Sequence, residues 1–192
     1  YTTAAEAVKL IRPHSSVYIQ GSTSIPETLV RAMTDRAAEL TDVTVYTGFA
    51  VGRADAPYCR PEYKETFLVN SLFVGNNIRR WLADGYGQSI PAFLGEIPAL
   101  FRSGALPVDV AILNVSRPNA DGYCSYGVSA DLAVSAVECA KTVIAQVNDA
   151  MPFSYGDALI HVSRIAAAVE VDEPLVELPT SVPNEVESRI GG

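Results

Sequence analysis

Residues 108–115 constrain the fold more than any other segment of the chain. They form a nearly continuous apolar run in which Asp109 is the one charged residue. A strand that is apolar on both faces is expected where helices cover both sides of a parallel sheet. Elsewhere, short β-type runs alternate with helical patterns, which is typical of βαβ units. The sequence therefore predicts an α/β fold: a Rossmann-like, open, mostly parallel sheet with helices on both faces and residues 108–115 in a central strand.

The remaining elements are predicted from hydrophobic spacing and turn residues. We expect helices at residues 3–11, 24–40, 78–83, 93–103 and 129–140, and strands at residues 16–20, 43–47, 67–75, 142–147, 158–162 and 166–171. The last two strands have a helical alternative, because the three alanines at 166–168 favour helix. Two serines are expected to cap helices. Ser24 opens the capping-box pattern S-x-x-E with Glu27, and Ser129 precedes the helix that follows it.

Residues 1–178 are expected to form one α/β domain, and residues 179–192 a linker toward a further domain. A chain of 192 residues is long enough to bury a core of its own. Three prolines, Pro174, Pro179 and Pro183, favour an extended tail of the kind found between domains.

Charge limits the partners of the chain. The formal net charge is −8 with scattered acidic residues, so neither a nucleic acid nor an anionic membrane is expected as a partner. No apolar run approaches the roughly 20 residues of a spanning helix. An anionic ligand would need a local basic cluster. Five basic side chains in the second quarter could form one, although a solvated helix face explains them equally well: Arg53, Arg60, Lys64, Arg79 and Arg80.

Cysteine and histidine usage argues against a metal site. Cys59, Cys124 and Cys139 are odd in number and lack C-x-x-C spacing, and the only histidines are His14 and His161. This is no zinc pattern, so we expect no metal. Unpaired cysteines favour a reducing compartment, and a cytoplasmic location is expected.

Four loops follow predicted strands: residues 21–24, 47–48, 114–127 and 148–156. Ligands of open parallel sheets bind outside the carboxyl ends of the strands, so these loops are expected to form the site. The 21–24 loop combines small residues with a helix N-terminus, which suits a carboxylate, a phosphate or a thioester oxygen. It matches no nucleotide-binding fingerprint. The alternative is that Gly21 only makes a turn and Ser24 only caps a helix.

The 114–127 loop is dense in turn-forming and hydrogen-bonding residues. It could be a tight surface loop whose tyrosines pack on the core, but ordered loops at this edge of a sheet commonly carry sites. Cys124 within it is a weak candidate nucleophile, because no histidine lies near it in sequence. His161 stands in an apolar run and is expected to be structural.

Several segments carry a resemblance to a known family. L-P-V-D-V-A-I at 106–112 leads through Ser116 to P-N-A-D-G-Y-C-S-Y-G-V-S at 118–129. A-K-T-V-I-A-Q-V-N at 140–148 precedes M-P at 151–152, I-H-V-S follows at 160–163, and D-E-P-L stands at 172–175. Over nearly its whole length the chain resembles the amino-terminal half of family I coenzyme A transferases of the acetyl-CoA hydrolase/transferase type, including 4-hydroxybutyrate and acetate CoA-transferases.

The resemblance implies an enzyme that moves coenzyme A between short-chain acyl-CoA and carboxylic acids through a glutamyl-CoA intermediate. It places the catalytic glutamate in a carboxy-terminal domain of the same polypeptide, so this chain alone is expected to be inactive. Coenzyme A is the implied cofactor-like substrate, and homo-oligomers are common in the family. This half is expected to supply substrate-binding residues and no catalytic ones: Gly21, Ser22, Thr23, Ser24, Thr47, Ser116, Pro118, Gly122, Tyr123, Ser125 and Gly127.

Two departures from the family pattern bear on the site. Many relatives read Ser-Pro-Pro-Asp where this chain has S-R-P-N at 116–119, and Arg-Thr where it has Phe153 and Ser154. The first change bears on substrate preference, and the second removes a positive charge. Two other functions stay open at this point, namely an acyl-CoA hydrolase of the same family and a non-catalytic module that binds a small anion.

Overall fold

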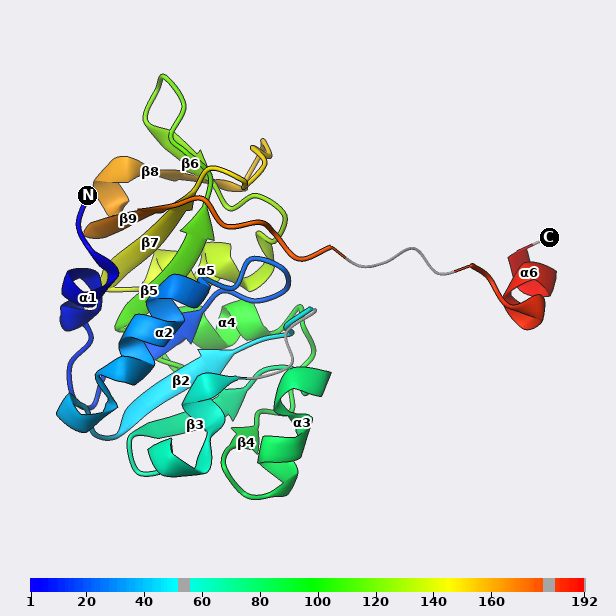
Figure 1. Ribbon diagram of the computed structural model, residues 1–192, viewed down its shortest axis with the longest axis horizontal. Coiled ribbons are helices and arrows are strands. Elements are labelled where there is room, and N and C mark those ends of the chain that lie inside the picture. The colour runs from blue at the N-terminus through cyan, green and yellow to red at the C-terminus, as the bar shows by residue number, and fades with distance from the viewer. Residues whose placement is uncertain (52–55, 178–181, 192) are drawn as a thin grey trace.

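A seven-stranded sheet organises the molecule (Figure 1). The computed structural model describes residues 1–51, 56–177 and 182–191. The strand order is β4-β3-β2-β1-β5-β7-β9, and every neighbouring pair in it is parallel. The strands are β1 (Ser16–Ile19), β2 (Val43–Thr47), β3 (Phe67–Ser71), β4 (Gln88–Ser89), β5 (Val110–Val115), β7 (Thr142–Asn148) and β9 (Ala167–Val171). The predicted α/β fold with a mostly parallel sheet is confirmed.

The buried strand predicted at 108–115 is β5, all six of whose residues are buried. It lies between β1 and β7, one position from the middle of the sheet, which β1 occupies. A separate antiparallel ribbon joins β6 (Tyr123–Ser125) to β8 (Leu159–His161). Strands β8 and β9 settle the choice left open for residues 158–171 in favour of strand.

Helices cover both faces of the sheet and divide the core in two. One face packs against α1 (Ala4–Ala7), α2 (Glu27–Asp35) and α3 (Asn76–Ala83), and the other against α4 (Ile97–Arg102) and α5 (Asp131–Cys139). Successive residues of one strand therefore pack into the hydrophobic cores on opposite faces of the sheet. Ile112 lies in the core with α2, whereas Leu113 lies in the core with α5. Short 3-10 turns complete the chain: η1 (Val8–Leu10), η2 (Ala37–Glu39), η3 (Pro57–Cys59), η4 (Pro61–Tyr63) and η5 (Val162–Arg164).

Both predicted serine caps are wrong. The N-cap of α2 is Pro26, and the buried Ser24 hydroxyl has no hydrogen-bond partner among the described residues. The first-turn N–H of Thr28 is bonded instead by Gln146 Oε1 of β7, at 3.2 Å. A tertiary contact has thus replaced the local cap. At α5 the N-cap is Ala130, and Ser129 Oγ donates to the carboxylate of Asp131 at 2.8 Å.

Three further differences concern the remaining helices and one edge strand. The helix expected at 93–103 begins at Ile97, which places Pro98 in the first turn, where proline is tolerated. Edge strand β4 lies in a segment predicted to be loop. The expected extended tail contains α6 (Glu185–Gly191), opened by reciprocal bonds between Asn184 and Glu187. That N-x-x-E spacing was its signal in the sequence. Pro179 lies outside the described residues, and the expected linker role of 179–192 stays a prediction.

Gln20 joins the segments that leave the sheet beside β1 and β5. Its fully buried amide accepts from the N–H of Asn114 at 2.8 Å and donates to the carbonyls of Tyr126, at 3.3 Å, and Ser129, at 2.7 Å. Backbone groups beyond the last paired residue of a strand lose their ladder partners, and this one side chain satisfies three of them. Gln20 therefore fixes the end of the 116–127 loop and the start of α5 against β1.

Replacing Gln20 with leucine is predicted to destabilise the chain by about 3 kcal/mol, because three buried backbone groups lose their partner. Chemical denaturation measures the change in the free energy of unfolding. The exposed Gln88→Leu is the matched control and should stay within about 0.5 kcal/mol of the unmodified chain. Equal decreases in the free energy of unfolding of the two variants would show that the hydrogen bonds of Gln20 do not stabilise the chain more than those of an exposed glutamine.

Candidate functional site

The order of the strands reverses direction between β1 and β5. Strands β2, β3 and β4 extend the sheet on one side of β1, while β5, β7 and β9 extend it on the other. At such a switch point the connections after the two central strands turn toward opposite faces and leave a crevice at the carboxyl edge. The 21–24 loop follows β1 and the 116–127 loop follows β5, so both begin at this crevice.

The 21–24 loop is held against the residues that follow β2. The N–H of Ser22 donates to the carbonyl of Phe49, and the N–H of Val51 donates back to the carbonyl of Ser22 at 3.1 Å. A Cβ at Gly21 would lie 2.7 Å from the carbonyl oxygen of Phe49, so only glycine allows this approach. Ser22 itself has a left-handed φ of 58°. The two predicted site loops are therefore locked together by their backbones.

A cavity of about 240 Å³ opens where these loops meet α5. Its walls come from both loops, from β1, from the residues after β3, from the segment before α4 and from the start of α5: Tyr18, Gly21, Ser22, Gly48, Phe49, Leu72, Phe73, Leu94, Asp131 and Leu132. The rings of Phe49 and Phe73 meet edge to face with centroids 5.1 Å apart, and both side chains are about half exposed. The cavity thus combines mainly apolar walls with polar groups at Ser22 and Asp131.

Two of the five residues predicted in the first two loops line this cavity. Gly21 and Ser22 line it, whereas Thr23, Ser24 and Thr47 are not among its described lining residues. The buried Thr47 hydroxyl accepts a hydrogen bond from the Tyr58 hydroxyl at 3.1 Å, so it serves packing.

The hydroxyls predicted in the 116–127 loop are used within the protein. Ser116 Oγ accepts from the N–H of Ser125 and donates to the carbonyl of Arg117, both at 2.9 Å. Ser125 Oγ accepts from the N–H groups of Gly127 and Ser154 and donates to the carbonyl of Ser154. Both serines are buried, so their bonds order the loop.

Packing also explains the glycines and the tyrosine of this loop. Gly122 and Gly127 have left-handed φ values of 80° and 66°. A Cβ at Gly127 would lie 2.1 Å from Met151 Sδ, which leaves no room for a side chain. Tyr123 packs edge to face on the ring of His161, with centroids 5.0 Å apart. Pro118 is exposed. These residues do not line the 240 Å³ cavity, and their binding role stays a prediction.

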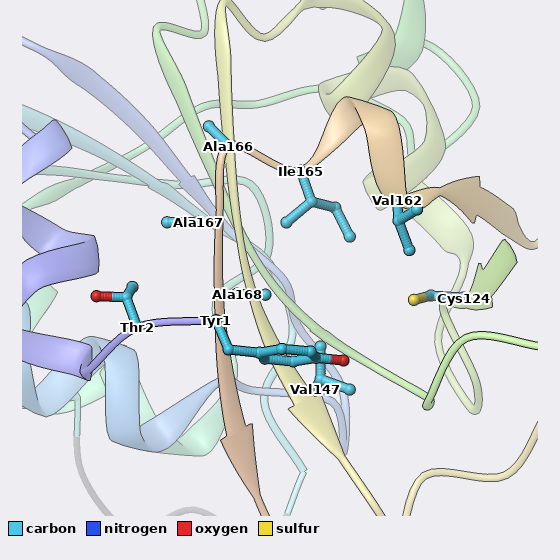
Figure 2. A pocket seen from close by; sticks show the side chains of 9 residues that line it. All are labelled: Tyr1, Thr2, Cys124, Val147, Val162, Ile165, Ala166, Ala167 and Ala168. Atoms are coloured by element: carbon cyan, nitrogen blue, oxygen red, sulfur yellow. The ribbon is translucent and has the colours of Figure 1, made fainter. Parts of the chain in front are cut away.

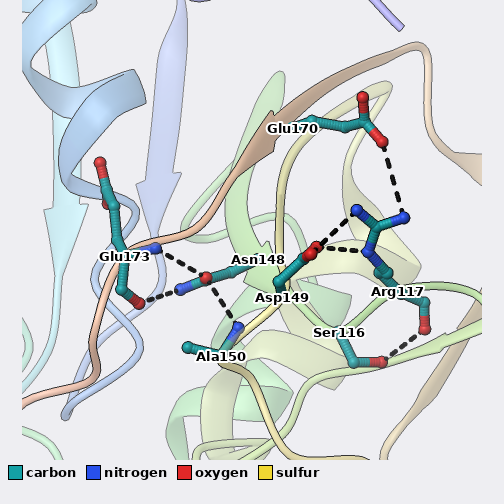
Figure 3. A network of polar contacts seen from close by, with 7 residues as sticks. All are labelled: Ser116, Arg117, Asn148, Asp149, Ala150, Glu170 and Glu173. Atoms are coloured by element: carbon teal, nitrogen blue, oxygen red, sulfur yellow. Dashed lines mark hydrogen bonds and ion pairs between the residues drawn. The ribbon is translucent and has the colours of Figure 1, made fainter.

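The two departures from the family pattern lie in this region. Arg117 forms two hydrogen bonds with the carboxylate of Asp149, which directly follows β7, and Figure 3 shows it reaching Glu170 as well. These neighbours raise the pKa of the Arg117 guanidinium, mainly because the guanidinium donates hydrogen bonds to the Asp149 carboxylate. Ser154 Oγ donates to the carbonyl of Gly127 at 2.9 Å. Both replacements brace the 116–127 loop.

A cavity of about 320 Å³ lies on the far side of that loop, between β9 and the β6–β8 ribbon (Figure 2). Cys124 faces it, and burial raises the pKa of this thiol to about 11. The register pairs Cys124 with Ile160, so His161 points to the other face of the ribbon. Cys124 is therefore protonated near neutral pH and His161 does not face it as a base, which argues against Cys124 as a nucleophile.

A third cavity, about 550 Å³, runs along β2, β3 and β4 away from both loops. Of the five basic residues proposed as an anion site, Lys64 lines it, Arg80 stacks on Trp81, and Arg53 lies outside the described residues. Among the residues described, no group of three or more His, Cys, Asp or Glu side chains could hold a metal. Nor does that part of the chain contain a helix with the length and apolarity to span a membrane.

Sequence reasoning missed the apolar half of the site. Phe49, Phe73 and Leu132 were not predicted as site residues, because glycines and hydroxyl groups were expected to bind the substrate. Phe49 had a signal in its position, two residues beyond the strand predicted at 43–47, where a core residue is not expected. Phe73 had no such signal, because the strand predicted at 67–75 includes it, whereas β3 ends at Ser71.

The fold is that of coenzyme A transferase domains. The chain superposes on RipA from Yersinia pestis with a TM-score of 0.86 and 29% identity, covering 96% of this chain and 45% of that one. For 4-hydroxybutyrate CoA-transferase from Porphyromonas gingivalis the TM-score is 0.74 and the identity 33%, covering 92% and 40%.

Sequence comparison specifies the family. Residues 1–178 match the acetyl-CoA hydrolase/transferase N-terminal domain, and the chain belongs to this family. It is 39% identical to 4-hydroxybutyrate coenzyme A transferase of Clostridium kluyveri, covering 98% of this chain and 44% of that protein. It is 32% identical to the succinyl-CoA:acetate/propanoyl-CoA:succinate CoA transferase of Fasciola hepatica, covering 97% and 38%. The chain thus spans less than half the length of these relatives.

Cys124 is predicted to react with iodoacetamide at pH 8 about 100-fold more slowly than a free cysteine, because raising the thiol pKa from 9.0 to about 11 removes most of the thiolate. The partly exposed Cys139 is the internal comparison. Peptide mass spectrometry after timed labelling reads both rates. If Cys124 reacts faster than Cys139, the thiol is activated and the nucleophile hypothesis returns.

Proposed function

We propose that this chain is the amino-terminal half of an enzyme that transfers coenzyme A between a short-chain acyl-CoA and a carboxylic acid of the 4-hydroxybutyrate or acetate type. The supporting observation is the 240 Å³ cavity at the carboxyl edge, built from the loops after β1 and β2. Cavities for drug-sized ligands are about 300–1,000 Å³, so this one suits a short acyl chain better than a whole coenzyme A.

The residues of this half would bind and shield the acyl group. Leu72, Phe73 and Leu132 offer apolar contact to its carbon chain, while Ser22 and Asp131 offer hydrogen-bond partners to a polar end. Apolar walls exclude water, which favours transfer to a carboxylate over hydrolysis. The relatives from Clostridium kluyveri and Fasciola hepatica, both CoA transferases by name, likewise support transfer rather than hydrolysis.

The covalent chemistry is assigned to the remainder of the polypeptide. A glutamate there attacks the thioester carbonyl and expels the coenzyme A thiolate, giving a mixed anhydride. The thiolate then attacks the glutamyl carbonyl, releases the first carboxylate and forms glutamyl-CoA, which the second carboxylate resolves by the reverse steps. The relatives are more than twice as long as this chain, which leaves room for such a domain.

The isolated 192-residue chain is predicted to transfer no coenzyme A from acetyl-CoA to 4-hydroxybutyrate, whereas the whole polypeptide does. A covalent mechanism without its nucleophile loses several orders of magnitude in rate. The new thioester is measured by chromatography of the products. Turnover by the isolated chain would place the chemistry in this half. Free CoA as the main product would indicate a hydrolase. Absence of transferase activity in the whole polypeptide with every short acid would contradict the proposal.

Gly48→Ala in the whole polypeptide is predicted to lower kcat/KM for a four-carbon acyl-CoA about tenfold relative to acetyl-CoA, as expected when one methyl group is added to a binding pocket. The new Cβ would lie 3.9 Å from Leu132 Cδ1, a normal contact that shortens the cavity without strain. Gly95→Ala is the matched control, because its Cβ meets no atom within 4 Å. An equal loss with both substrates would mean that the cavity does not hold the acyl chain.

A further inference from the structure

Residues 172–177, which follow β9 and are called the exit segment, are hydrogen-bonded to the end of β7. Asn148, the last residue of β7, is buried. Its Oδ1 accepts from the N–H of Glu173 at 3.1 Å, and its Nδ2 donates to the carbonyl of Glu173 at 2.9 Å. Figure 3 shows this pair of bonds beside the Arg117–Asp149 contact. The backbone of the exit segment thereby runs along the carboxyl edge of the sheet.

The side chain of Glu173 reaches further, to the first turn of α2. Its Oε2 accepts from Gln146 Nε2 at 2.9 Å, and its Oε1 accepts from the hydroxyl of Thr28. Gln146 Oε1 in turn accepts from the N–H of Thr28. The three residues form a closed ring of hydrogen bonds, although 145 positions separate Thr28 from Glu173.

This ring takes the place of the missing helix cap. The first N–H groups of a helix have no intrahelical acceptor and carry a partial positive charge, which favours a carboxylate nearby. Gln146 is fully buried, so both ends of its amide need partners, and the ring supplies them. Removing the carboxylate would leave Gln146 Nε2 and the Thr28 hydroxyl without this acceptor.

The ring links the exit segment to the wall of the proposed acyl cavity. Only residues 25–27 separate Thr28 from the 21–24 loop, and Ser24 donates its N–H back to Gly21 at 3.1 Å. We propose that Glu173 is a positioning residue: its carboxylate holds the 21–24 loop and the outgoing chain in one fixed arrangement, so that the following half of the polypeptide presents its reacting group to the cavity. This inference rests on the proposed transferase function.

The test compares variants of the whole polypeptide. Glu173→Ala removes both acceptors, whereas Glu173→Gln keeps the shape of the side chain and can still accept from Gln146 and donate to Thr28. Thr28→Val removes one bond without shortening the side chain. Glu177→Ala, an exposed carboxylate on the same segment, is the matched control. Hydrogen–deuterium exchange of residues 22–30 and 172–177 is measured together with kcat and KM for both substrates.

In Glu173→Ala both segments should exchange faster, and kcat should fall at least about tenfold, because small misplacements of reacting groups are costly. KM should change much less, since the cavity walls remain. Glu173→Gln should recover most of kcat, Thr28→Val should share the defect, and Glu177→Ala should match the wild type. Residues 110–115 should stay protected throughout. If Glu173→Ala fails to fold, Thr28→Val decides.

Unchanged exchange in Glu173→Ala and Thr28→Val would overturn the proposal. So would faster exchange or lower thermal stability with kcat intact, because the contact would then be only structural. A wild-type polypeptide without transferase activity would instead refute the proposed function. In that case the exchange data alone decide whether Glu173 joins the exit segment to α2.

Discussion

Buried amide side chains at the carboxyl ends of β1 and β7 supply the hydrogen bonds at the edge of the sheet on which the rest of the structure depends. Gln20, Gln146 and Asn148 are all almost fully buried. Inside the sheet the backbone ladder satisfies every polar group, but beyond the last pair these groups need new partners. Gln20 supplies them for the segments after β5, and Gln146 and Asn148 supply them for α2 and the exit segment. These bonds pair the backbone groups where the chain turns at this edge, whereas two buried side-chain atoms there, Ser24 Oγ and Asn114 Oδ1, have no hydrogen-bond partner among the described residues.

The carboxyl edge of the sheet has a polar part, the 116–127 loop, and an apolar part, the 240 Å³ cavity. The apolar cavity supports the proposed function. The serines of the 116–127 loop form hydrogen bonds within the loop and to Ser154, which orders the loop. On the other side of Gln20, the 21–24 loop is locked to Phe49 and leaves an open cavity with aromatic walls. A short acyl chain fits such a cavity, whereas the covalent step requires a group that this half is not proposed to supply.

Much of the fold could be predicted from the sequence because hydrophobic patterns within short segments determine most of its strands and helices. The apolar run at 108–115 gave β5, and the β-branched run at 43–47 coincides with β2. The caps could not be predicted, since the partner that replaces Ser24 lies 118 positions from Thr28. A candidate site at the carboxyl edge was expected from the parallel sheet, but the residues that line its cavity were mostly not. Predicted hydroxyls such as Ser125 are consumed by packing, while the unpredicted Phe49 and Phe73 form the cavity.

The central claim is that this half holds the acyl group while another half of the polypeptide carries the nucleophile. The most direct test is to mix the whole polypeptide with acyl-CoA, reduce any glutamyl thioester with borohydride, and locate the resulting alcohol by peptide mass spectrometry. The account predicts one modified glutamate, located outside residues 1–192. A modified glutamate within this chain, at Glu27 or Glu173 for example, would contradict it.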